Sequence, residues 1–245
     1  MLFTVSALSL LGVAAASPIA ACNNPNANKP SYPAKQTSKG FKLVANVTDP
    51  SRDFKDPIHN KFLTPLHTGA AVNVIGIARD GDKAPVFYQT GNQQERLSGA
   101  TRIAVDLGTP PSAFGFSLQS DNGKSFASTA HADAGAGQAG VSVTHDPVPF
   151  AFLNLAEFAI CEEPLPALQN QQYKVLHQFN TLSSAEKIPE DCVPITVIPQ
   201  CATLEDLLEG SRASHDDAFE AGCYEDVSSI EWSKYSSFNW NSFSA

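Results

Sequence analysis

Several features that would assign this chain to a function class are scarce among its 245 residues. Only 16 Lys and Arg stand against 25 Asp and Glu, which gives a formal net charge of −9, and the basic side chains are scattered singly. Binding to a phosphate backbone or to an anionic membrane surface needs clustered basic side chains. The composition therefore argues against nucleic acid as a partner.

Long apolar runs are also missing beyond the first residues. No later segment approaches the ~18 uninterrupted apolar residues of a membrane-spanning helix, so no membrane span is expected. Residues 2–16 are apolar or small, and Ala14 and Ala16 match the small-x-small pattern that precedes a cleavage site. We expect a signal peptide over residues 1–16, a mature chain that begins at Ser17, and secretion from the cell, with the cell wall as an alternative location.

A second processing pattern overlaps the first. Residues 19–22 match the site at which bacterial lipoproteins are cleaved and acylated, here on Cys22. Pro18 and the absence of basic residues before the apolar run argue against this reading. The fate of Cys22 stays open at this point.

Cysteine is scarce, and four of the five residues lie between positions 161 and 223. An even set in an exported protein is typical of disulfides, and the C-x-x-C pairs of many zinc sites are missing. Three pairings are possible, and the shorter loops favour Cys161 with Cys192 and Cys201 with Cys223. Each bridge would contribute about 3 kcal/mol by restricting the unfolded chain.

Short alternating segments separated by turn residues are abundant. They predict an all-β fold, either an antiparallel β-sandwich or a partly closed barrel. Hairpins are expected between 70–78 and 85–89, and between 114–119 and 125–130 at the turn with Asn122 and Gly123. The full set of expected strands is 41–47, 70–78, 85–89, 101–107, 114–119, 125–130, 141–144, 150–161, 173–179 and 193–198.

The remaining segments complete the expected domain organisation. Residues 17–40 form a flexible leader before a β-sandwich domain over 41–200. Residues 201–232 are expected to be a disulfide-bridged helical excursion, with a helix over 204–209. The tail 233–245 alternates aromatic residues with Ser and Asn, and disorder is favoured over docking of its rings in a groove.

Histidine and serine give no complete catalytic pattern. There is no G-x-S-x-G motif. The weak functional candidates are His67, His131 and His145. A metal site from His131, Asp133 and His145 is geometrically conceivable, but an H-x-D triplet occurs by chance too often to count. His215, which precedes two aspartates, is expected to be solvated. No catalytic residue, metal site or cofactor is predicted.

Four carboxylates are the candidates for a two-acid glycosidase: Asp106, Glu157, Glu162 and Glu163. Glu157 lies in an apolar run, where burial would suit an acid catalyst. An outward position on a half-exposed strand explains the same pattern. The glycosidase hypothesis is therefore weak.

Two strings carry structural expectations. Asn46-Val47-Thr48 is the only N-glycosylation sequon in the chain, and strand alternation directs Lys42, Val44 and Asn46 to solvent. In the second string, Gly69 after His67 indicates a bend or bulge before the next strand.

Four short strings also carry a resemblance. The chain resembles, over residues 40–200, a family of small secreted proteins of unknown function from filamentous ascomycete fungi. The resemblance implies secretion and a β-rich domain, and it brings no catalytic residues. The strings are Gly40-Phe41-Lys42-Leu43 with 46–49, His67-Thr68-Gly69-Ala70, 84–88, and Pro189-Glu190-Asp191-Cys192.

These observations favour a non-catalytic extracellular binding or effector-like protein, whose partner would be a cell-wall glycan or a component of a host surface. One alternative is an extracellular hydrolase acting on polysaccharide or another polymer. Another is a passive component of the cell wall or surface. A histidine beside an acid and a hydroxyl in a pocket would favour the hydrolase.

Overall fold

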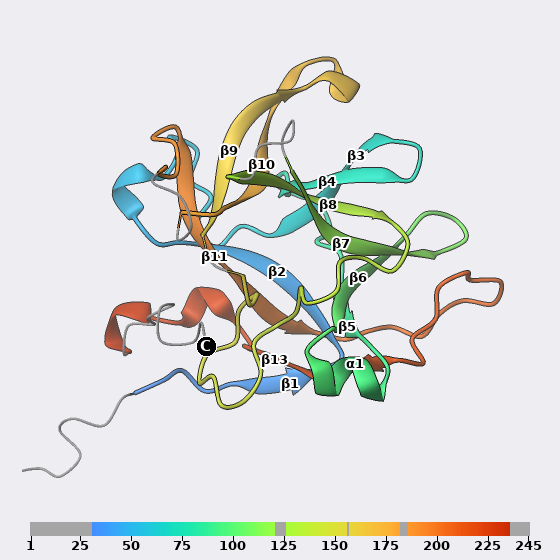
Figure 1. Cartoon of the computed structure of the whole chain (residues 1–245). Coiled ribbons are helices and arrows are strands. Elements are labelled where there is room, and N and C mark those ends of the chain that lie inside the picture. The colour runs from blue at the N-terminus through green and yellow to red at the C-terminus, as the bar shows by residue number, and fades with distance from the viewer. Residues whose placement is uncertain (1–30, 121–125, 156, 182–185, 236–245) are drawn as a thin grey trace, which may run out of the picture. The chain divides into compact units, whose positions relative to one another are not determined.

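The computed structural model describes residues 31–120, 126–155, 157–181 and 186–235, and strands dominate this part of the chain (Figure 1). The expected signal peptide, Cys22 and tail residues 236–245 lie outside it. None of the helices described is long and apolar enough to cross a membrane. The strands are β1 (Gln36–Ser38), β2 (Gly40–Val47), β3 (Leu63–Gly69), β4 (Val72–Ile77), β5 (Phe87–Thr90), β6 (Arg102–Leu107), β7 (Ser112–Ser120), β8 (Ala127–Ala134), β9 (Phe158–Leu165), β10 (Gln171–Phe179), β11 (Cys192–Ala202), β12 (Ala218–Phe219) and β13 (Ala221–Cys223). The helices are α1 (Gln93–Ser98) and the 3-10 turns η1 (Pro50–Arg52), η3 (Pro166–Leu168), η4 (Val227–Ser229) and η5 (Trp232–Lys234).

Eleven strands form one sheet in which every pairing between named strands is antiparallel. The order is β10-β9-β11-β2-β5-β6-β7-β8-β4-β3, with β12 beside β5. β10 also pairs with β8, where His177 lies opposite Thr129, and with β4. The pairings from β8 through β10, β9, β11, β2, β5, β6 and β7 therefore return to β8. The prediction of a mostly β, antiparallel fold is confirmed.

β2 shows how alternation builds the core. Phe41, Leu43 and Ala45 are fully buried, as their phase predicts. Val44 was expected to face solvent, yet it is only 1% exposed, because Phe62 bridges to it and covers that side of the strand. The largest fully buried side chains are Tyr88, Tyr224, Phe41, Phe87, Phe116, Leu43, Ile58, Leu63, Ile75, Ile103, Leu153 and Ile160.

Strand pairing differs from the sequence prediction in two places. The expected hairpin between 70–78 and 85–89 is wrong, because β4 pairs with β3, which was not predicted, while β5 pairs with β2 and β6. Residues 141–144 form no strand and make one isolated bridge, from Val143 to Leu153. Leu153 belongs to the expected strand over 150–161, which is also wrong in its first half because β9 begins only at Phe158. The pairing of β7 with β8 is confirmed, as is an irregularity between His67 and Gly69, where the register shifts.

The two ends of the expected β-domain also differ from prediction. The helix over 204–209 is absent. The extended chain there brings Leu204 against the buried cluster of Tyr88, Ala104 and Ala218, whereas Leu208 is 74% exposed. In the expected leader, residues 36–38 form β1, which pairs with β13. Hydrogen bonding to the bridged C-terminal segment thus orders residues whose composition alone favours a loop.

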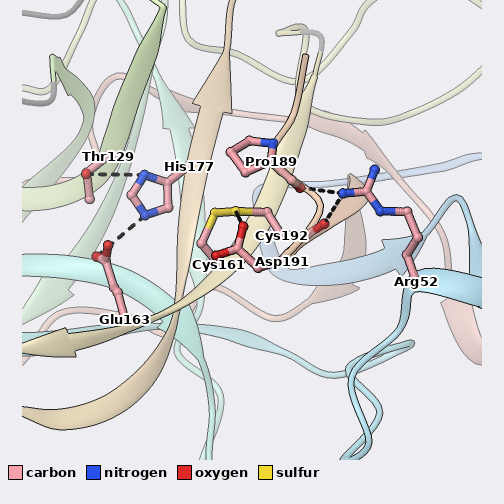
Figure 2. The surroundings of a disulfide bond; sticks show 8 residues. All are labelled: Arg52, Thr129, Cys161, Glu163, His177, Pro189, Asp191 and Cys192. Carbon is pink, nitrogen blue, oxygen red and sulfur yellow. Dashed lines mark hydrogen bonds and ion pairs between the residues drawn. A yellow bond between two sulfur atoms is a disulfide. The ribbon is translucent and has the colours of Figure 1, made fainter. Parts of the chain in front are cut away.

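Both disulfides have the pairing that the shorter loops favoured. Cys161–Cys192 joins directly opposed residues of β9 and β11, and Cys201–Cys223 joins β11 to β13. Figure 2 shows the first bridge between two polar groups. On one side, the Arg52 guanidinium donates to the carbonyl oxygen of Cys192 at 2.6 Å. On the other, His177 lies between Thr129 and a glutamate of β9.

Candidate functional site

The described residues enclose a cleft of about 720 Å³. The loop after η1 and the end of β4 form part of its lining, and β9 and β10 supply the rest. Four of its side chains are basic, in a protein whose net charge is −9. We call it the charged cleft, and its lining residues are Phe54, Lys55, Asp56, Pro57, Lys61, Ile77, Ala78, Arg79, Asp80, Glu162, Gln172, Tyr173 and Lys174.

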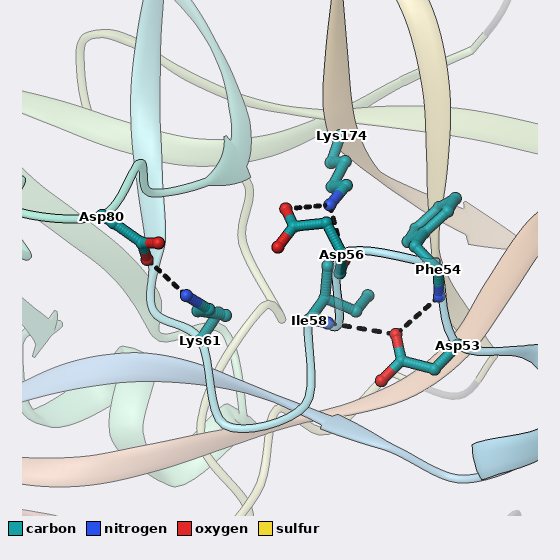
Figure 3. Close-up of polar contacts among 7 residues, drawn as sticks. All are labelled: Asp53, Phe54, Asp56, Ile58, Lys61, Asp80 and Lys174. Atoms are coloured by element: carbon teal, nitrogen blue, oxygen red, sulfur yellow. Dashed lines mark hydrogen bonds and ion pairs between the residues drawn. The ribbon is translucent and has the colours of Figure 1, made fainter.

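The loop that forms one wall is held by a carboxylate and a buried side chain (Figure 3). Asp53 Oδ1 accepts hydrogen bonds from the backbone N–H groups of Phe54, at 2.8 Å, and Ile58, at 3.0 Å. The Ile58 side chain is fully buried. The intervening residues Lys55 and Asp56 are exposed, so the loop presents charge to the cleft from a fixed base.

Two ion pairs join this loop to its neighbours (Figure 3). Lys174 Nζ on β10 lies 2.7 Å from both the backbone oxygen and the carboxylate of Asp56. That hydrogen bond and the lysine charge lower the pKa of Asp56. Lys61 pairs with Asp80, and the hydrogen bond to this aspartate raises the pKa of Lys61. In both pairs the aspartate side chain is exposed at the rim of the cleft.

Cations also cap the two aromatic rings of the cleft. The Arg79 guanidinium lies 4.9 Å from the centre of the Tyr173 ring, and its Nη2 donates to the Tyr173 hydroxyl at 2.6 Å. Lys174 Nζ lies 5.1 Å from the centre of the Phe54 ring. Such contacts hold the long basic side chains against the wall of the cleft.

Two of the candidate histidines, His67 and His131, are connected through the polar residues Asn73 and Asp133. His67 Nδ1 on β3 lies 3.3 Å from Asn73 Oδ1 on β4. The Asn73 backbone N–H donates to Asp133 Oδ1 at 3.0 Å, and Asp133 Oδ2 lies 3.7 Å from His131 Nδ1. The hydrogen bonds of Asn73 therefore link β3, β4 and β8 into one polar cluster, which explains these residues structurally.

His145 does not join this cluster. It is exposed after Thr144 and lines a separate hollow of about 490 Å³ with Lys35 and Asp146. In the ranges that the structure describes, no group of three His, Cys, Asp or Glu side chains is placed to hold a metal ion.

A third arrangement joins residues that the sequence did not bring together. Asp106 on β6 accepts a hydrogen bond from the Tyr88 hydroxyl at 3.0 Å, and its other oxygen lies 2.7 Å from His215 Nε2. The His215 and Asp106 side chains are only 18% and 17% exposed. Burial, followed by the Asp106 charge, raises the pKa of Tyr88. The expectation that His215 is solvated is therefore wrong.

The other candidate carboxylates have separate partners. Glu157 accepts from the backbone N–H of Thr181 at 2.6 Å and from its hydroxyl, so it joins two chain segments. Glu163 lies 3.5 Å from His177, whereas Glu162 is exposed in the charged cleft. Asp106, Glu157 and Glu163 thus take part in three separate contacts.

Asn46, the expected glycosylation site, lies within β2 opposite Thr196. Its side chain is partly buried, and its Oδ1 atom is buried with no hydrogen-bond partner among the described residues. Nearby, the Thr48 hydroxyl donates to the backbone oxygen of Pro194 at 3.2 Å. The sequon thus lies in a paired strand, which is less accessible to glycosylation than a turn would be.

Sequence reasoning missed the charged cleft as a site. Its basic residues are isolated in the sequence, and β3, β4 and β10 bring them together. The one local signal is the pair Arg79-Asp80, which was interpreted only as a turn. Tyr173 and Lys174 lie at the start of a predicted strand. Nothing in the sequence around them indicates that Tyr173 contacts Arg79, 94 positions earlier.

Comparison with known proteins identifies the family. The chain is 39% identical over 211 residues to "Antigenic protein SchS34" of Stachybotrys chartarum, an alignment that covers 84% of this chain and 95% of that protein. No solved structure matches the chain. The family model described as "Domain of unknown function (DUF7907)" matches residues 38–201, so the chain belongs to this family.

Proposed function

We propose that this protein is a secreted, non-catalytic binding or effector-like protein, whose partner is a cell-wall glycan or a component of a host surface. The charged cleft is the observation that carries the proposal. Its volume of about 720 Å³ falls within the range of small-ligand sites. It also combines two aromatic rings with hydrogen-bonding side chains, as recognition of a polar ligand requires.

We base the proposed extracellular location on one sequence prediction and two observations. The proposed signal peptide covers residues 1–16, and the two disulfides suit an oxidising compartment. A relative with 39% identity is named an antigenic protein, which agrees with a fungal protein that reaches a host. We further propose that Asn46 carries an N-linked glycan, added before the sequon is enclosed in β2.

Extracellular hydrolysis of polysaccharide or another polymer is the competing function. The pairing of Asp106 with His215 favours it, because an acid at one ring nitrogen orients the other to act as a base. However, the described residues place no nucleophile in hydrogen-bond contact with this imidazole, and the neighbouring Ser214 hydroxyl accepts from the backbone N–H of Asp216. The pair of Asp106 and His215 therefore lacks the nucleophile that a serine hydrolase needs.

An array of glycans and other polymers, probed with protein purified from culture supernatant, tests the proposal. We expect saturable binding to at least one saccharide, with no release of soluble product. Silence across the array would contradict a binding role and favour a passive wall or surface component. Product release would instead favour the hydrolase.

A further inference from the structure

We infer that the charged cleft binds an acidic saccharide, whose carboxylate is held by Arg79. This inference rests on the proposed binding function and names its ligand class. It starts from the distribution of charge in the cleft, where four basic side chains meet three acidic ones.

Two of the three carboxylates of the cleft form an ion pair with a lysine. Asp56 is bonded to Lys174 and Asp80 to Lys61. Glu162 lies opposite Lys174 in the pairing of β9 with β10. The two ion pairs largely neutralise both lysines and two of the acids, so they supply little attraction for an added anion. Glu162 then remains as one negative charge against the two positive charges of Arg79 and Lys55.

Of the four basic side chains in the cleft, the Arg79 guanidinium and the Lys55 ammonium make no ion pair with a carboxylate of the described residues. The guanidinium of Arg79 donates to a neutral phenol, the Tyr173 hydroxyl, so its charge is not cancelled. A guanidinium has five N–H donors in a planar fork, and this contact engages Nη2 alone. The ring of Tyr173 beneath it fixes the fork, which is therefore oriented in advance for a bidentate bond to a carboxylate.

The rest of the cleft favours a sugar over a simple anion. Its lining includes the rings of Phe54 and Tyr173, the amide of Gln172 and the rim carboxylates. The C–H faces of a pyranose ring can lie against aromatic edges, while its hydroxyls find amide and carboxylate partners. A sugar that also carries a carboxylate can contact this lining with its ring and hydroxyls and the Arg79 guanidinium with its carboxylate.

Isothermal titration with a trimer of galacturonate tests this inference. The comparison ligand is the methyl ester of the same trimer, which keeps the sugar and removes the charge. We expect the ester to bind at least tenfold more weakly than the acid. R79Q should lose at least tenfold in affinity for the acid and little for the ester, and R79K should recover only part of the loss because a lysine cannot form the fork.

The matched control is R212Q. It removes the same charge from an exposed side chain outside the cleft and should change the affinity less than twofold. Equal binding of acid and ester, or an equal loss in R79Q and R212Q, would overturn the inference and leave the binding function standing. Binding of polyglutamate as tight as that of the trimer would show a generic anion site and overturn the saccharide assignment. If no polymer on the array binds the protein, the proposed binding function is wrong as well.

Discussion

Two buried tyrosine hydroxyls should make the stability of this protein depend on alkaline pH. Tyr224 is 1% exposed, and its hydroxyl oxygen accepts from the backbone N–H of Ala151 at 3.0 Å. Burial raises the pKa of Tyr224 to about 12, and burial beside Asp106 also raises that of Tyr88. Since an unfolded tyrosine ionises near pH 10, the unfolded chain loses protons first as the pH rises.

The free energy of unfolding should therefore fall as the pH rises above about 10, through the interval up to the folded-state values. Y224F should make this slope shallower. It should also cost about 1–3 kcal/mol at pH 8, because the Ala151 N–H loses its buried acceptor. Urea unfolding at pH 8, 10 and 11 measures both effects. Y32F is the control, since Tyr32 is exposed, and an alkaline slope that is the same in Y224F and in the wild-type protein would contradict the prediction.

At the scale of elements, a close backbone approach fixes where one loop crosses the sheet. The Gln138 N–H donates to the backbone oxygen of Phe116 at 2.8 Å, which holds the loop after β8 against β7. A Cβ atom on Gly115 would lie 2.0 Å from the backbone nitrogen of Gly137. Only glycine fits at position 115, because a Cβ atom there would overlap with the backbone of the loop. The loop backbone could make room only if the neighbouring residues of the loop moved with it.

G115A should therefore destabilise the protein by about 3 kcal/mol, the upper part of the usual range for overpacking. The matched control is G222A in β13, where the new methyl group would first meet Ala151 Cβ at 3.4 Å and should change the stability by less than about 0.5 kcal/mol. Urea midpoints of the two variants provide the measurement. Similar midpoints for both would show that the loop is not held as described.

Most strands could be predicted because alternation is a local property, whereas their partners are not. The period of two in β2 and in β7 is legible in the sequence. β3 was missed because Pro65 interrupts its pattern. The expected helix over 204–209 has leucines at helical spacing, but the structure packs Leu204 against the Tyr88 cluster in an extended chain and leaves Leu208 exposed. A short helix forms only when packing supports its apolar face. In contrast, α1 is capped by Asn92 and Glu95, a pattern present in the sequence but not used.

The candidate site could be predicted far less well than the strands. Arg79 and Tyr173 touch only because β10 pairs with β4. Likewise, His215 reaches Asp106 across 109 positions of sequence. Contacts of this kind depend on the complete topology, which local periodicity does not encode.

The whole molecule depends on two covalent links that act on different parts of it. Cys161–Cys192 lies within the closed path of strands, between β9 and β11. Cys201–Cys223 attaches the C-terminal segment, and through β13 it also orders β1. Loss of the first link should loosen the sheet that forms one wall of the charged cleft, whereas loss of the second should free the chain ends.

Reduction should therefore remove a large share of the stability. The cysteines are separated by 31 and 22 positions, and closing loops of these lengths in the unfolded chain contributes about 3–4 kcal/mol for each bridge. Together that is comparable with the ~5–15 kcal/mol of a typical domain. Urea unfolding with and without a thiol reductant measures the loss, and a variant with serine at all four positions serves as the control because the reductant cannot change it. Equal midpoints for the oxidised and reduced wild-type protein would contradict this account, as would alkylation of all four cysteines in the folded protein before any reductant is added.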